Sequence, residues 1–207
     1  GMPIDLDQEA LGVSEPRTLS KEALRQMRPA DRVSTILRHT HAMAFGRLCE
    51  LCGLADGPGR FAGAPGAQGA GGIGAGGVTG STGSSGSGAF ASVKQILDDA
   101  LESAVLVQGC WVLKSSLACA NEKDVLPRNL LLLHFTKQRM ITSTAFAQLA
   151  KISTQGARDI LAHVAVPCPG HGWEFKLPTD AAFEAEYPAI ANAQRGEWQC
   201  LERELSQ

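Results

Sequence analysis

The chain has 207 residues, of which 44% are hydrophobic and 19% charged, and its formal net charge is −2. This balance is typical of an ordinary globular protein and excludes a global basic field of the kind that attracts nucleic acid. No apolar run approaches the ~20 residues that span a bilayer, no secretory leader is evident, and the six scattered cysteines indicate a reducing compartment.

The first quarter of the chain predicts an arm followed by helices. Residues 1–18 are polar and acidic without a sustained period, which predicts a flexible arm. A helix is expected after Ser20, and Pro29 restarts a second helix whose apolar residues recur at helical spacing. Residues 42–45 are expected to form a short strand, and residues 45–54 another helix that ends at Gly53.

A low-complexity segment interrupts the first predicted domain. Residues 55–89 consist mainly of Gly with Ala, Ser and Thr, and contain too little apolar surface to order themselves. We therefore predict a disordered insertion between two helices of one domain. Residues 90–103 supply the next helix, and a strand, a turn at Gln108–Gly109 and a returning strand at residues 110–114 follow it.

The same order of elements recurs in the second half. Pro127 opens a very apolar helix, Thr142 or Ser143 caps another, and Ser153 caps a third. A strand, a Gly- and Pro-containing turn and a returning strand at residues 173–177 complete the repeat. The two returning strands read Trp-Val-Leu-Lys and Trp-Glu-Phe-Lys. A supersecondary unit used twice is typical of a tandem array.

The sequence therefore predicts an α+β fold, mostly α, with tandem winged-helix domains, small β-wings and a C-terminal helix. Winged helix 1 is expected over residues 19–117, winged helix 2 over 127–179, a linker over 118–126, and a C-terminal helical extension over 180–207. The structural core candidates are aromatic residues of the two returning strands: Trp111, Trp173 and Phe175.

No residue pattern indicates catalysis. Gly69 to Gly74 matches GxGxxG literally, but neither a strand before it nor a helix after it is expected, so the match is a product of the Gly-rich tract. Cys49 and Cys52, together with Cys168 and His171, would form a tetrahedral zinc set. However, the first pair lies on an apolar helix, where cysteine behaves as a small hydrophobe, and the second lies in another domain. We predict no catalytic residue, cofactor or metal.

Three surfaces are candidates for interaction. The third helix of the second domain presents Gln155 and Arg158 on its polar side. The final helix is acidic and carries an apolar stripe, which is expected either to pack on the second domain or to contact a partner: Ile190, Trp198, Leu201 and Leu205. The leading helices carry a candidate basic surface: Lys21, Arg25, Arg28, Arg32 and Arg38.

DNA binding is the main alternative, because winged helices often insert their third helix into the major groove. Asp159 accompanies Arg158 on that helix, and Asp98, Asp99 and Glu102 on the corresponding helix of the first domain would repel phosphates. The charge pattern therefore favours protein-interaction domains over a free-standing winged-helix DNA-binding transcription regulator.

Several short segments resemble the C-terminal part of a known RNA polymerase III subunit, the one that belongs to the enzyme's TFIIF-like heterodimer. The resemblance covers residues 19–205 except the Gly-rich insertion, which is not a feature of that family. The family's dimerisation module has no counterpart in this sequence. The matching segments are residues 105–117 (VLVQGCWVLKSSL), 133–140 (LHFTKQRM), 172–180 (GWEFKLPTD), 31–54, and Tyr187-Pro188 with Trp198.

By this resemblance the chain is a non-catalytic subunit, or a fragment of one, of nuclear DNA-directed RNA polymerase III. It would act as a protein-interaction scaffold in the transcription of small RNAs. The resemblance implies other polymerase III subunits as partners and no membrane. Contacts with the polymerase's transcription factors, and weak or indirect contact with DNA, stay open.

Overall fold

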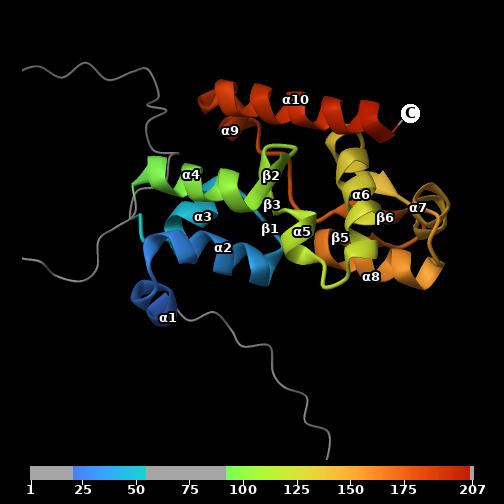
Figure 1. Cartoon of the computed structure of the whole chain (residues 1–207), viewed down its shortest axis with the longest axis horizontal. Coiled ribbons are helices and arrows are strands. Elements are labelled where there is room, and N and C mark those ends of the chain that lie inside the picture. The colour runs from blue at the N-terminus through green and yellow to red at the C-terminus, as the bar shows by residue number, and fades with distance from the viewer. Residues whose placement is uncertain (1–20, 55–91, 206–207) are drawn as a thin grey trace, which may run out of the picture.

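The computed structural model describes residues 21–54 and 92–205 (Figure 1). The predicted arm, the whole Gly-rich insertion and the last two residues lie outside the described residues. Within the described ranges the fold is mostly helical and has two small antiparallel sheets. The predicted class, α+β and mostly α, is confirmed.

The first unit contains a three-stranded sheet of order β1-β3-β2. Its β2–β3 turn passes through Gln108 and Gly109, both with positive φ. A Cβ on Gly109 would lie 2.2 Å from the carbonyl oxygen of Asp180, so this position requires glycine. The elements are α1 (Lys21–Gln26), α2 (Pro29–Thr40), β1 (Ala42–Met43), α3 (Phe45–Leu51), α4 (Val93–Ser103), β2 (Ala104–Val107) and β3 (Cys110–Leu113).

The second unit repeats this order, and its sheet has the equivalent order β4-β6-β5. Thr142 and Ser153 cap α7 and α8 as predicted, whereas the two-residue strand β4 was not predicted. The elements are α6 (Val125–Lys137), β4 (Met140–Ile141), α7 (Ser143–Ala150), α8 (Thr154–Val164), β5 (Ala165–Cys168) and β6 (Gly172–Phe175). Between the units lie α5 (Ser115–Ala118) and the 3-10 turn η1 (Glu122–Asp124).

Each unit buries one face of its sheet against its own helices. Trp111 on β3 is fully buried in the first core, and Phe175 on β6 is fully buried in the second. Trp173 is half-buried and packs against the second core. The second core also contains Val107, Val112 and other residues from the opposite face of the first sheet. The two units therefore share a core.

Two helices end the chain, α9 (Ala181–Glu186) and α10 (Pro188–Leu205). Figure 1 shows α10 running along one side of the molecule, over both units. Its buried residues are Ala191, Gln194 and Trp198, at the spacing of one helix face. Among the helices of the described ranges, none combines the length and hydropathy that a bilayer crossing requires.

Candidate functional site

The lysine that follows each returning strand binds the end of the preceding helix. Lys114 Nζ donates to the carbonyl oxygens of Leu101 at 2.9 Å and Glu102 at 2.7 Å, in the last turn of α4. Lys176 Nζ donates to the carbonyl oxygen of His163 at 2.7 Å and also to that of Thr40 in the first unit. Unpaired carbonyls at a helix C-terminus favour cations. The repeated Trp-x-x-Lys segment therefore caps α4 and α8, and in the second unit it also joins the units.

The contact region between the units, which we call the junction, gathers basic side chains. Arg128 on α6 is fully buried, and its Nη1 donates to the Leu113 carbonyl oxygen at 2.7 Å and to Ser115 Oγ at 3.0 Å. Burial lowers the pKa of Arg128 to about 10. The His41 and His163 rings stack across the junction with their centroids 4.5 Å apart.

The turn of the first sheet is bound to the second unit. Gln108 Nε2 donates to the Phe135 carbonyl oxygen at 2.6 Å, and Gln108 Oε1 accepts from Arg139 Nη1 at 2.7 Å and Thr179 Oγ1 at 2.9 Å. The backbone N–H of Asp180 donates to the Gln108 carbonyl oxygen at 2.9 Å. These bonds fix the orientation of one unit relative to the other.

Helix α10 supplies hydrogen-bond partners to backbone groups at the free edge of the first sheet. Trp198 Nε1 donates to the carbonyl oxygen of Leu106 at 2.8 Å, and the backbone N–H of Leu106 donates to Gln194 Oε1 at 2.9 Å. Because β2 is an edge strand, these two groups would otherwise lack a partner in the sheet. The helix thereby protects an edge that would be available to another strand.

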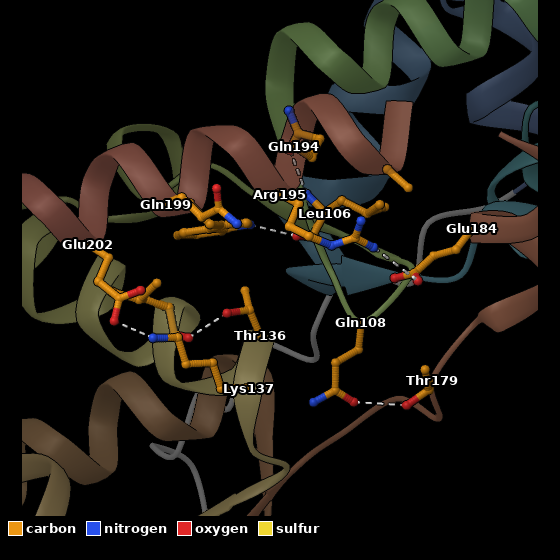
Figure 2. Close-up of a pocket in the computed structure, with 13 residues that line it drawn as sticks. Leu106, Gln108, Thr136, Lys137, Thr179, Glu184, Gln194, Arg195, Gln199 and Glu202 are labelled. Carbon is orange, nitrogen blue, oxygen red and sulfur yellow. Dashed lines mark hydrogen bonds and ion pairs between the residues drawn. The ribbon is translucent and has the colours of Figure 1, made fainter. Parts of the chain in front are cut away.

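A cleft of about 450 Å³ opens beside α10 (Figure 2). Two ion pairs lie on its rim, Lys137 with Glu202, and Arg195 with Glu184 at 3.8 Å. Because these rim charges are paired, the cleft has no strong charge of one sign. Its lining comes from both units and from α10: Leu106, Gln108, Leu133, Thr136, Lys137, Thr179, Glu184, Ala191, Gln194, Arg195, Trp198, Gln199 and Glu202.

Comparison with known proteins identifies the family. A family model described as RPC5 protein matches residues 3–207. The chain belongs to the RPC5 family. It is 28% identical over 137 residues to DNA-directed RNA polymerase III subunit RPC5 of Homo sapiens and to that of Mus musculus. Each alignment covers 56% of this chain and 19% of the relative, so the chain spans about one fifth of the length of these relatives.

In this RPC5-family chain, the predicted interaction residues separate into two groups. Gln155 and Arg158 are exposed on α8, where Gln155 Nε2 donates to Asp159 Oδ1 at 2.8 Å. Trp198 is buried in the second core and hydrogen-bonded within the chain, so of the two alternatives for the stripe it follows intramolecular packing. Of the remaining stripe, Ile190 and Leu201 are half-buried against the two cores, and Leu205 is exposed.

The predicted basic surface needs one correction. Arg32 is only 5% exposed, and its guanidinium donates to the carbonyl oxygens of Met27 at 3.1 Å and Cys52 at 3.3 Å. Arg32 therefore joins the backbone before α2 to the backbone after α3 inside the first unit, and it does not belong to the basic surface. Arg28 and Arg38 are exposed, and Arg28 pairs with Asp31 at 2.8 Å. The side chains of Lys21 and Arg25 lie outside the described part of the structure.

The cysteines considered as zinc ligands lie in different places. Cys49 and Cys52 are buried in the first core, and burial raises the pKa of Cys49 to about 12 and that of Cys52 to about 11. Cys168 lies on β5 of the second unit, where its Sγ is 3.7 Å from Glu174 Oε2. In residues 21–54 and 92–205, no three His, Cys, Asp or Glu side chains are grouped as metal ligands would be.

The junction is the feature that the sequence prediction missed. The apolar run in β2 and β3 could have predicted it, because a strand that is buried on both faces has a continuously hydrophobic sequence. The returning strand of the second unit alternates instead, with Glu174 between Trp173 and Phe175. That contrast indicates that only the first sheet is covered on both sides.

The histidine stack should make stability depend on pH. Burial, and then the positive charges of His163, Arg128, Lys176 and His39, lower the pKa of His41 from 6.5 to about 4. The pKa of His163 is also lowered, by burial and then by Arg128 and Lys176, while Asp159 opposes this shift. The unfolded chain therefore binds protons more readily than the folded chain at these histidines. Their contribution to the free energy of unfolding is fully present above pH 6.5 and is lost as the pH falls toward 4.

We expect the free energy of unfolding at pH 4.5 to be about 1–2 kcal/mol below that at pH 7.5. The full pKa shift of His41 would give a larger difference, but solvent screens a ring that is only partly buried. Urea unfolding at the two pH values measures this. The control is His41→Asn, since Asn tolerates the left-handed backbone at this position, where φ is 61°. An equal pH dependence in the variant would contradict the role of His41.

Proposed function

We propose that this chain is a non-catalytic part of DNA-directed RNA polymerase III and serves as a protein-interaction scaffold in the nucleus. The main support for this proposal is the match to the RPC5 family model, which extends across both units and α10. Relatives in that family are named subunits of this polymerase. The proposed partners are other subunits of the polymerase and its transcription factors, with DNA contacted weakly or indirectly.

We also propose that the two units are winged helices in tandem. From α2 onward in the first unit, and from α6 in the second, the order is helix, short strand, helix, helix, strand, strand, and in each unit the third strand lies between the other two. That order and pairing are those of a winged helix, with β2–β3 and β5–β6 as the wings. The proposed domain boundaries are residues 19–117 and 127–179, with the extension at 180–207 packing on both.

The exposed face of α8 is the proposed partner contact. Ala157, Ile160 and Leu161 supply the opposite face of the helix to the second core. Gln155 and Arg158 are exposed and are not needed for that packing. Because Asp159 adjoins Arg158, the mixed charge suits a protein surface with a complementary carboxylate better than a phosphate backbone.

Reversing the charge of Arg158 tests this contact. We expect Arg158→Glu to reduce co-purification of polymerase III subunits with the tagged chain, while the free energy of unfolding changes by no more than ~0.5 kcal/mol. The control is Lys94→Glu, the same charge reversal at an exposed position of α4, the corresponding helix of the first unit. Equal recovery of subunits with the Arg158→Glu variant and with the unmodified chain would exclude this face.

A free-standing DNA-binding regulator is the competing function. The corresponding face of α4 carries Asp98 and Glu102, and both would repel phosphates. Of the basic leading residues, Arg32 serves the interior of the first unit. No specific observation among the described residues favours this second function.

A further inference from the structure

The outer face of the second sheet is exposed and largely apolar. In the order β4-β6-β5, Met140, Glu174 and Val166 pair in one row across the sheet. Met140 is 37% exposed and Val166 45% exposed. Their neighbours along the strands, Ile141 and Phe175, point to the opposite face and are buried in the second core. The row therefore lies on the side of the sheet that its own unit does not cover.

The matching row of the first sheet is covered by a helix. Ala42, Val112 and Val105 pair across β1, β3 and β2 in the same register. Ala42 and Val112 are buried, and they share a core with Leu131, Leu132 and Phe135 of α6. Thus the fold itself contains one example of an apolar helix seated on the outer face of a sheet of this order.

The central position of the row differs between the sheets. Val112 of the first sheet corresponds to Glu174 in the second, since each follows the tryptophan of its returning strand. Glu174 Oε1 lies 3.1 Å from Arg139 Nε, and Glu174 Oε2 lies 3.7 Å from Cys168 Sγ. The Glu174 side chain is 38% exposed, so a carboxylate accessible to a partner's cation stands between two aliphatic side chains.

We propose that this face docks a helix of a partner protein, one whose aliphatic stripe carries a lysine or arginine opposite Glu174. The aliphatic residues would cover Met140 and Val166, as α6 covers Ala42 and Val112. Helix α6 of another copy is not available for this, because it is buried in its own junction. A nucleic acid is disfavoured because the Arg139 charge at this face is already paired with Glu174 and leaves no surplus positive charge for phosphates. The inference deepens the proposed scaffold role and rests on it for the existence of a partner.

Site-specific photocrosslinking tests the proposal. A benzophenone amino acid is introduced in the tagged full chain at Val166, or at Leu149 as a control, which is 49% exposed on α7. After irradiation in extract of the source cells, protein adducts are mapped to residues of the acceptor. We expect adducts at position 166 to exceed those at position 149 about tenfold. We expect them to fall in a helix of the stated chemistry and to be lost with Met140→Glu but not with Leu149→Glu.

Three results overturn the docking site: no excess of adducts at position 166, adducts with nucleic acid, or an acceptor segment of other chemistry. The same experiment separates this inference from the proposed function. A helix of the stated chemistry in a protein outside polymerase III supports the docking site and contradicts the proposed function. Recovery of polymerase III subunits without adducts at position 166 supports the function and overturns the docking site.

Discussion

Replacing Trp111 by alanine should strongly destabilise the first unit. The indole is fully buried between the helices and the inner face of the sheet, and its ring centroid lies 5.6 Å from that of Phe183 in an edge-to-face contact. Losing so large a buried side chain removes about 3–5 kcal/mol. This is a large fraction of the 5–15 kcal/mol that ordinarily stabilises a domain, so urea unfolding followed by circular dichroism should show a clear loss.

Trp173→Ala is the matched comparison, because Trp173 occupies the same place in the second unit. The ring of Trp173 is half-buried, and it pairs across the sheet with Ile141 and the exposed Pro167. We expect a cost of about 1–2 kcal/mol, since less apolar area is removed from water in the native state. If the Trp111→Ala variant kept the unfolding curve of the unmodified chain, the assignment of Trp111 to the core would be wrong.

Replacing Trp198 by alanine should release α10. The substitution removes a buried ring from the second core and leaves the carbonyl oxygen of Leu106 without its side-chain donor. Together these losses should lower the free energy of unfolding by about 3–5 kcal/mol. Limited proteolysis should then cut the chain near Pro188 before the rest is digested, because a detached helix exposes its backbone to protease.

Leu205→Ala provides the control at the end of the same helix. Leu205 is exposed, so its truncation should change stability by no more than ~0.5 kcal/mol and leave the proteolysis pattern unchanged. Equal protease resistance of α10 in the Trp198→Ala variant and the unmodified chain would mean that the rest of the stripe holds the helix without Trp198.

Local patterns predicted most of the elements because their causes are local. The Ser153 cap is a contact within one turn of chain, and Gly109 is required by a positive φ in a tight turn. The alternation of Trp173, Glu174 and Phe175 likewise reports a strand with one buried face. Each of these signals is contained in a few consecutive residues.

The junction and its consequences are not local. The burial of Arg32 depends on the carbonyl oxygen of Cys52, twenty residues further along the chain, and the burial of Trp198 depends on Leu106. A helical pattern shows that Trp198 lies on an apolar stripe, but it cannot say which surface covers that stripe. The cleft beside α10 was not predictable for the same reason, since both units and α10 contribute to its lining.

One paired measurement tests the central claim most directly, which is that the chain binds subunits of polymerase III and contacts duplex DNA only weakly. The tagged chain is used to recover subunits from extract, and in parallel its affinity for random duplex DNA is titrated against salt. We predict that polymerase III subunits are recovered and that duplex binding is no tighter than about 1 μM at physiological salt. Nanomolar duplex binding with a steep salt dependence, and no polymerase subunit recovered, would contradict the account and support the DNA-binding regulator.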